Sequence, residues 1–188
     1  MEGKMKIRYL EEKTDYDGSQ LSSHWIYKNF GLLGDSLVAF CGRCHVPVEK
    51  MVDQVDVKEN KPIYSEEMLH FLGEFFHNDL EKTILAQRLL ISLAQQEIIF
   101  KTKKLIVRGG NDLYDEGAKL SVAIATLSPV STLIHFGINI SSHGTPVKTK
   151  GLLDYNIEAA LFAQTLLESF RDEMLTVNLA RAKVRPVY

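Results

Sequence analysis

Three short runs of apolar and β-branched residues, at 104–108, 119–127 and 131–140, follow one another with only turn residues between them. Such runs are typical of neighbouring strands of one sheet. Nearer the start of the chain, residues 4–10 alternate like a strand, and a more buried strand is predicted to end at Gly42. Strands are therefore expected in both halves of the chain.

Helical patterns lie between and after these strands. Ser65 and the two glutamates that follow it have the form of a helix start, with an oxygen cap and acids in the first turn. A longer helix is predicted over 79–99, with Leu85 and Leu89 on its inner face, and a last helix over 157–170. Because strands and helices do not alternate in a repeating βαβ rhythm, the pattern favours an α+β sheet layered by helices.

The composition limits the classes of protein to which the chain can belong. Its 188 residues, 45% hydrophobic and 24% charged, are typical of one domain that buries a real core. We expect a single unit over 1–188, with a core over 1–175 and a C-terminal extension over 176–188. The net charge of -2 gives no global basic field, so nucleic acid is not an expected partner. No apolar run approaches the roughly 18 residues of a membrane span, and the first residues do not resemble a signal peptide, so we expect a cytoplasmic protein without a membrane partner.

The segment C-G-R-C-H, at residues 41–45, matches the pattern that attaches a c-type haem, and zinc or a redox dithiol would use the same residues. Haem attachment normally follows export, which argues against haem here. A closed zinc site needs four ligands, and no second pair accompanies Cys41, Cys44 and His45. We therefore expect no metal site and interpret the segment as a strand end plus a loop, with a disulfide left open for a hyperthermophilic source.

The candidate functional residues lie in the stretch from residue 108 to residue 140. Gly109 and Gly110 allow the backbone to come close to a ligand at a strand end. Asn111 and Asp112 follow at once, and Lys119 begins an otherwise apolar strand, where a solvated charge has no need to be. Plainer explanations stand beside this one: Asn111 and Asp112 as a turn pair, and Lys119 as a guard against aggregation at a strand edge.

The order of these residues resembles the catalytic core of biotin protein ligases. N-D-L-Y at 111–114, a turn, G-A-K-L at 117–120, an apolar strand and then G-I-N at 137–139 follow that family's pattern over about 60 residues. Arg108, followed by the two glycines, is similar to the R-x-G-G segment of the related lipoate ligases. The resemblance implies a single mixed, mostly antiparallel sheet flanked by helices. The whole chain is identified as a member of an uncharacterised archaeal family whose function is unassigned.

The resemblance also implies an activity. These ligases join a carboxylic acid to ATP, form an acyl-adenylate and pass the acyl group to a carrier-protein lysine. Lys119 matches the family's lysine, which would stabilise the charge that develops between the carboxylate and the α-phosphate. Asp112 would hold Mg²⁺ or fix the polar head of the ligand, Asn111 would orient the turn, and Asn139 would contact the nucleotide. A structural hydrogen bond is an equally good explanation of Asn139.

The chain departs from the ligase pattern at several places, among them Ser121 and Val122, which replace the small residues that follow K-L in the ligases. The ligases close a loop with several glycines and arginines over the adenylate, and here Gly42 and Arg43 give one such pair. Gly109 and Gly110 replace the tryptophan and proline that precede N-D in the ligases. A second hypothesis therefore stands beside the enzyme: a non-catalytic module that binds a nucleotide, an RNA end or a protein. Partners under the first hypothesis are a small carboxylic acid, a nucleotide and a carrier protein, with a homodimer left open.

Overall fold

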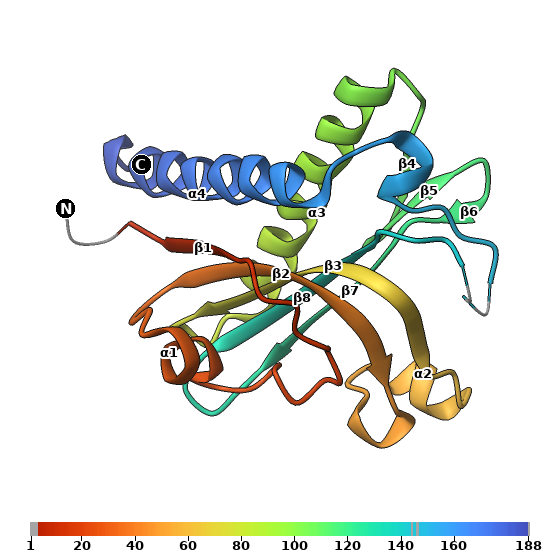
Figure 1. The fold of residues 1–188 in the computed structure, drawn as a ribbon. Helices are drawn as coiled ribbons and strands as arrows, with labels where there is room; N and C mark the ends of the chain where they lie inside the picture. Colours follow the sequence, from red (N-terminus) through yellow and green to blue (C-terminus); the bar gives the residue numbers. More distant parts are fainter. Residues whose placement is uncertain (1–3, 144, 146, 188) are drawn as a thin grey trace.

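The centre of the structure, a computed structural model that describes residues 4–143, 145 and 147–187, is a five-stranded sheet (Figure 1). In spatial order its strands are β1 (Lys6–Leu10), β2 (Ser36–Val46), β3 (Ile63–Phe75), β8 (Thr132–Asn139) and β7 (Ser121–Leu127). Strand β1 pairs with β2 in parallel, and the other three pairs are antiparallel. The predicted mixed, mostly antiparallel sheet is confirmed.

A second, three-stranded sheet stands at one end of the molecule (Figure 1). It consists of β4 (Val107–Gly109), β5 (Asp112–Asp115) and β6 (Ala118–Lys119). The prediction that 104–108 joins the same sheet as the later strands is wrong in this respect. Two tight turns fold this segment back on itself, because Gly110 and Gly117 have the positive φ angles of 64° and 77° that glycine adopts easily.

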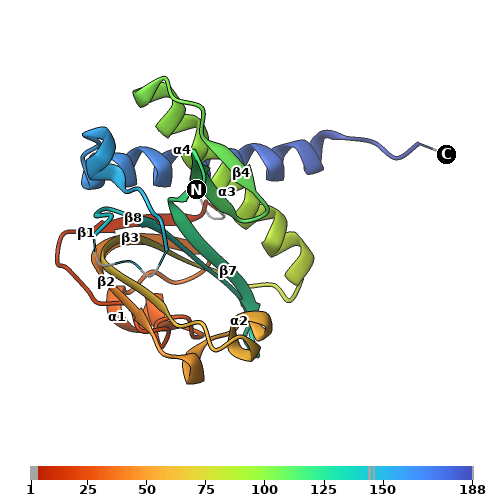
Figure 2. The ribbon, with the colours of Figure 1, turned by 90° about the vertical axis from the view of Figure 1, so that its right-hand side faces the viewer.

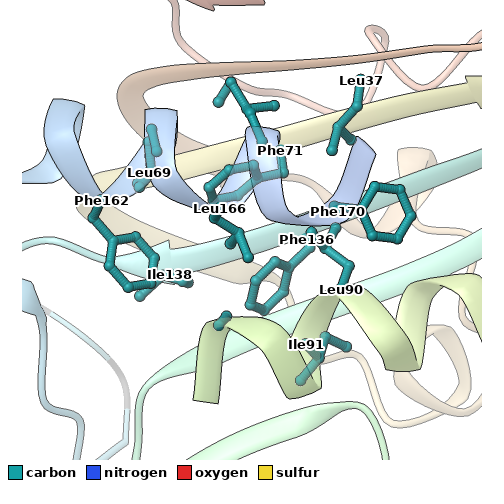
Figure 3. Packing of buried hydrophobic residues seen from close by; sticks show 14 of the residues in the cluster. Leu37, Leu69, Phe71, Leu90, Ile91, Phe136, Ile138, Phe162, Leu166 and Phe170 are labelled. Carbon is teal, nitrogen blue, oxygen red and sulfur yellow. The ribbon is translucent and has the colours of Figure 1, made fainter. Parts of the chain in front are cut away.

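Helices α3 (Leu80–Thr102) and α4 (Ala159–Lys183) cover one face of the main sheet (Figures 1 and 3). Asp79 caps the first of these helices and Glu158 the second, each through side-chain oxygens that accept backbone N–H groups. The largest hydrophobic cluster lies between these helices and the sheet. Its labelled members in Figure 3 are Leu37, Leu69, Phe71, Leu90, Ile91, Phe136, Ile138, Phe162, Leu166 and Phe170.

The opposite face of the sheet is covered less evenly. Helix α1 (Trp25–Phe30) and the segment around Tyr16 pack there against a smaller cluster that includes Phe40, Met68 and Leu72. Past the end of β2 come two short helices, a 3₁₀ turn at Val48–Lys50 and α2 (Gln54–Lys58). A second 3₁₀ turn, Leu152–Tyr155, precedes α4. This face retains room for a cavity.

The helix predicted to start at Ser65 is wrong, because residues 63–75 form β3, in the middle of the sheet. All residues from Met68 to Phe75 are buried, since one face of the strand packs on the helices and the other on the smaller cluster. A strand that is buried on both faces loses the alternation of polar and apolar residues that identifies strands in a sequence.

The two long helices begin close to their predicted starts, but they turn slightly different faces inward. In α3 the sheet-facing residues are Leu90, Ile91, Ala94 and Ile98, while Leu85, predicted inward, is 61% exposed. The last buried residue of α4 is Phe170, and the helix then continues to Lys183 away from the sheet (Figure 2). In the described part of the chain no helix combines the length and apolarity that crossing a membrane requires.

Candidate functional site

A cavity of about 690 Å³ opens on the face of the main sheet that the long helices leave free. Its walls come from both halves of the chain. Residues 16–68 supply mostly apolar side chains, including Tyr16, Val46 and Met68. Residues 111–149 supply most of the polar ones, which form the polar end of a largely apolar cavity, and residues 50–61 add Lys50, Asp53, Asp56 and Lys61. This composition suits a small molecule with a charged head.

Lys119 lies at the polar end, paired with Asp112. Its Nζ is 2.7 Å from Oδ2 of Asp112, and the two side chains are 32% and 17% exposed. Pairing in the small sheet brings them together, because Lys119 stands opposite Tyr114 and Asp112 is two residues from Tyr114 on the same face of β5. Burial raises the pKa of Asp112, while the Lys119 ammonium opposes this rise. The Asp112 carboxylate thus holds the Lys119 ammonium at the cavity wall, although burial there deprives the carboxylate of part of its solvation.

Two asparagines complete this end of the cavity. The Asn111 side-chain amide donates to the backbone oxygen of Ala123, 2.6 Å away, which ties the small sheet to edge strand β7. The amide of Asn139, at the end of β8, donates to the backbone oxygen of Lys119 at 3.4 Å. Asn111 and Asn139 both line the cavity, and in each the side-chain oxygen accepts no hydrogen bond from the described residues. Those oxygens remain available to a ligand.

Two segments whose role the sequence did not indicate also reach the cavity. Thr145 and Thr149 lie beside Lys119, whose backbone N–H donates to the oxygen of Lys148 at 3.0 Å. On the other side, the segment after β2 contributes Lys50, at the end of the 3₁₀ turn, and Lys61, just past α2. In the sequence both segments look like ordinary polar loops. The signal that could have indicated their role is the gathering of hydroxyl and lysine side chains around apolar residues.

The remaining predicted ligand residues lie elsewhere. Arg43 is exposed on β2 and does not line the cavity. Arg108 does not line the cavity either, and its guanidinium donates a hydrogen bond to the backbone oxygen of Gly110 in the β4–β5 turn. Gly109 and Gly110 shape that turn and do not line the cavity. In the described part of the chain no arginine borders the cavity, and the cations that do are Lys50, Lys61 and Lys119.

The C-G-R-C-H segment lies within β2, which continues to Val46, so the predicted strand end at Gly42 is wrong. A bulge between Gly42 and Cys44 interrupts the pairing with β3 there. Cys41 packs in the helix-covered cluster and Cys44 in the cluster on the opposite face, so the two thiols point apart. Burial raises the pKa of Cys44 to about 12, which makes it an unreactive thiol. Across residues 4–143, 145 and 147–187, no three His, Cys, Asp or Glu side chains gather as a metal site would require.

Two buried histidines lie beside Tyr16, and one of them, His135, lines the cavity. Nδ1 of His70 lies 3.0 Å from Nε2 of His135, and Nε2 of His70 lies 3.4 Å from the backbone oxygen of Gly42. The Tyr16 ring stacks on the His135 ring with centroids 3.8 Å apart. Burial lowers the pKa of His70 to about 4, and burial followed by the neighbouring His70 lowers that of His135. Both rings are therefore neutral at pH 7.

The lowered pKa of His70 predicts a pH-dependent stability. Between about pH 6.5 and pH 4 the unfolded chain binds a proton at this residue that the folded protein does not, so stability falls as the pH falls through this window. His70 alone should cost about 2 kcal/mol between pH 7 and pH 5. Denaturant unfolding at a series of pH values measures this, and the variant His70→Asn should show a shallower slope. A flat unfolding free energy across the window would contradict the prediction.

Comparisons with known proteins agree with this fold. The family model described as a domain of unknown function, DUF366, matches residues 5–185. An uncharacterised protein of Methanocaldococcus jannaschii is 41% identical over 160 residues, which cover 82% of this chain and 72% of that protein. A solved protein of unknown function from Pyrococcus horikoshi is 40% identical, with a TM-score of 0.92 over 98% of this chain and 100% of that one.

More distant structures share the architecture alone. Biotin protein ligase from Aquifex aeolicus is 14% identical, with a TM-score of 0.55 over 91% of this chain and 68% of that one. A bi-partite lipoate protein ligase from Thermoplasma acidophilum is 15% identical, with a TM-score of 0.58 over 92% and 84%. The resemblance to the biotin and lipoate ligases is thus confirmed for the fold, and the chain itself belongs to the DUF366 family, which has archaeal members and no assigned function.

Proposed function

We propose that this protein activates a small carboxylic acid with ATP and forms an acyl-adenylate. The observation that carries the proposal is the ammonium of Lys119, held by Asp112 at the polar end of a largely apolar cavity. An acid with an apolar body fits such a cavity with its carboxylate toward the cation. The likeness in fold to biotin protein ligase, one structure of which holds biotin and ATP, supports the proposal.

The chemistry requires two anions to approach each other. A carboxylate oxygen attacks the α-phosphorus of ATP, the bond from that phosphorus to the bridging oxygen breaks, and pyrophosphate leaves. In the proposed reaction the charge of Lys119, which lines the cavity, would offset the negative charge on both groups. At about 4 Å and an effective dielectric constant near 20, one such charge contributes on the order of 4 kcal/mol. The free oxygens of Asn111 and Asn139 would fix the ribose or the acid beside it.

The Mg²⁺ that accompanies ATP usually keeps several waters and takes only one or two protein carboxylates. Asp112 and Asp56 both border the cavity, and the charge of Asp56 contributes to the raised pKa of Asp112. This is the carboxylate pair that would benefit from a divalent cation. Lys50 and Lys61 stand on the same side as Asp56 and would meet the outer phosphates in place of arginines.

Release of pyrophosphate tests the proposal directly. The purified protein is incubated with ATP, Mg²⁺ and a panel of carboxylic acids that includes biotin, lipoate and octanoate, and pyrophosphate is measured by a coupled enzyme assay. We expect acid-dependent release with at least one member of the panel, since each offers an apolar body and a carboxylate. Absence of release across the panel, together with absence of nucleotide binding, would refute the proposal.

A second function, a binding module without turnover, is favoured by one observation. The arginines that would retain an adenylate do not border the cavity in the described part of the chain. Thermal unfolding separates the two functions, because a ligand that binds only the folded state raises its melting temperature whether or not it reacts. Stabilisation by ATP or by an acid without pyrophosphate release would favour the binding module.

A further inference from the structure

The floor of the cavity runs along β8 from its polar end to the histidine pair. Asn139 and His135 are four residues apart on the same face of this strand, which corresponds to about 13 Å of extended chain. Gly137 lies between them without a side chain, and Met68 from β3 occupies the space above it. A ligand with its charged head near Lys119 and Asn139 therefore extends over Met68 toward His135.

The hydrogen bonds of the histidine pair fix which nitrogens carry hydrogen. A backbone oxygen only accepts, so Nε2 of His70, which contacts the oxygen of Gly42, is protonated. In neutral His70 the other nitrogen, Nδ1, is then an acceptor, and its partner Nε2 of His135 must be the donor. Neutral His135 is left with an unprotonated Nδ1. The tautomer of His135 is thus set by a backbone oxygen at the bulge of β2.

The unprotonated nitrogen belongs to a residue that lines the cavity. Tyr16 covers a face of the His135 ring, and Nε2 is used by His70. Nδ1 of His135 has no hydrogen-bond partner in the described residues. Among the described residues, two side-chain polar atoms are buried from solvent without a hydrogen-bond partner, Ser36 Oγ and Gln87 Nε2. Nδ1 of His135 is not one of them. His135 is 3% exposed as a residue and lines the cavity.

From these contacts we infer that His135 Nδ1 accepts a hydrogen bond from the far end of the ligand. The substrate class is a carboxylic acid whose apolar chain ends in an N–H or O–H donor, such as an amide or a hydroxyl. His70 is a positioning residue, because it holds His135 in the accepting tautomer without reaching the cavity wall itself. The inference rests on the proposed function, since it takes the carboxylate to lie at Lys119.

A matched pair of acids tests the inference. Monoamides of straight-chain dicarboxylic acids from adipic to sebacic acid present a terminal NH₂, and the corresponding methyl ketones replace that NH₂ by CH₃ at almost unchanged shape. Calorimetric titration at neutral pH should show that the best-fitting monoamide binds about tenfold more tightly than its methyl ketone, the worth of one good hydrogen bond. The variant His135→Leu should abolish this preference.

The second variant tests the role of His70. His70→Leu removes the acceptor for His135 Nε2–H, so His135 is free to place its hydrogen on Nδ1, and the preference for the amide should vanish. His70→Asn supplies an oxygen close to the position of Nδ1 and should restore the preference. If the role of His70 were only structural, the two variants would show the same ratio of monoamide affinity to methyl ketone affinity.

The outcomes separate this inference from the proposed function. Pyrophosphate release with equal binding of amide and methyl ketone overturns the inference alone, and the absence of binding by either series, with no release, overturns both. Nitrogen-15 NMR of the histidine side chains adds a measurement that needs no ligand. Nδ1 of His135 should resonate as an unprotonated, pyridine-like nitrogen in the wild type, and a protonated signal there would refute the inference.

Discussion

Lys119→Ala should lower the rate of acid-dependent pyrophosphate release by about a thousandfold. The substitution removes the charge that offsets repulsion between carboxylate and phosphate, worth on the order of 4 kcal/mol, and each 1.4 kcal/mol corresponds to about a factor of ten in rate. The fold should remain, because Lys119 is a third exposed and its partner Asp112 retains contact with solvent. Steady-state kinetics with the best acid of the panel, alongside far-UV circular dichroism, measures both expectations.

Two further variants make the loss interpretable. Lys119→Met keeps the aliphatic stem without the charge and should be as inactive as the alanine variant. Lys13→Ala removes a lysine whose ion pair with Glu67 is at the surface, and it should leave the rate unchanged. Retention of more than a tenth of the activity in Lys119→Ala would show that the ammonium does not act on the reacting groups.

Gly42→Ala should destabilise the folded protein by about 3 kcal/mol, at the upper end of the cost of overpacking. A β-carbon at this position would overlap the backbone of Thr14 and its carbonyl oxygen. The segment 14–16 hydrogen-bonds to β2 on both sides of the glycine, through Thr14 N–H to the oxygen of Cys41 and Tyr16 N–H to the oxygen of Arg43. The backbone cannot withdraw without breaking these bonds, and denaturant unfolding measures the loss.

Gly109→Ala is the matched control for this substitution. An added β-carbon there meets only the ring of Tyr114, at 3.2 Å, and a side chain yields more readily than a backbone. We expect a loss below about 1 kcal/mol. Equal losses in the two variants would mean that the close approach of Thr14 to β2 is not what requires glycine in C-G-R-C-H.

The C-terminal half of the candidate site was accessible from the sequence, because its residues lie close together along the chain. Asn111, Asp112 and Lys119 belong to one small hairpin sheet, and Asn139 follows on the strand beside it. Local turn chemistry and the resemblance to the ligases both indicate this cluster. What they cannot indicate is that Arg108 lies outside the cavity, since this depends on which way a short exposed strand faces.

The N-terminal half was not predictable in the same way. The run around His70 is apolar on both sides, so it resembled a helix although it is the central strand of the sheet. Tyr16 reaches the cavity because its segment runs beside β2 at the bulge, where Tyr16 pairs in parallel with Cys44. Its contact with His135 joins residues more than a hundred positions apart, and no spacing in a single sequence records such a pair.

The stacking of Tyr16 on His135 has a consequence for how this protein acquires its cavity. One wall of the cavity includes Tyr16, near the beginning of the chain, and the floor includes His135, on a strand more than a hundred residues later. Neither segment forms the pocket by itself. Closing so long a loop costs conformational entropy. The contact between Tyr16 and His135 offsets this cost only once β2, β3 and β8 have paired. We therefore expect the binding surface to be among the last features to form during folding, and a ligand that fills it to hold the two halves of the polypeptide together.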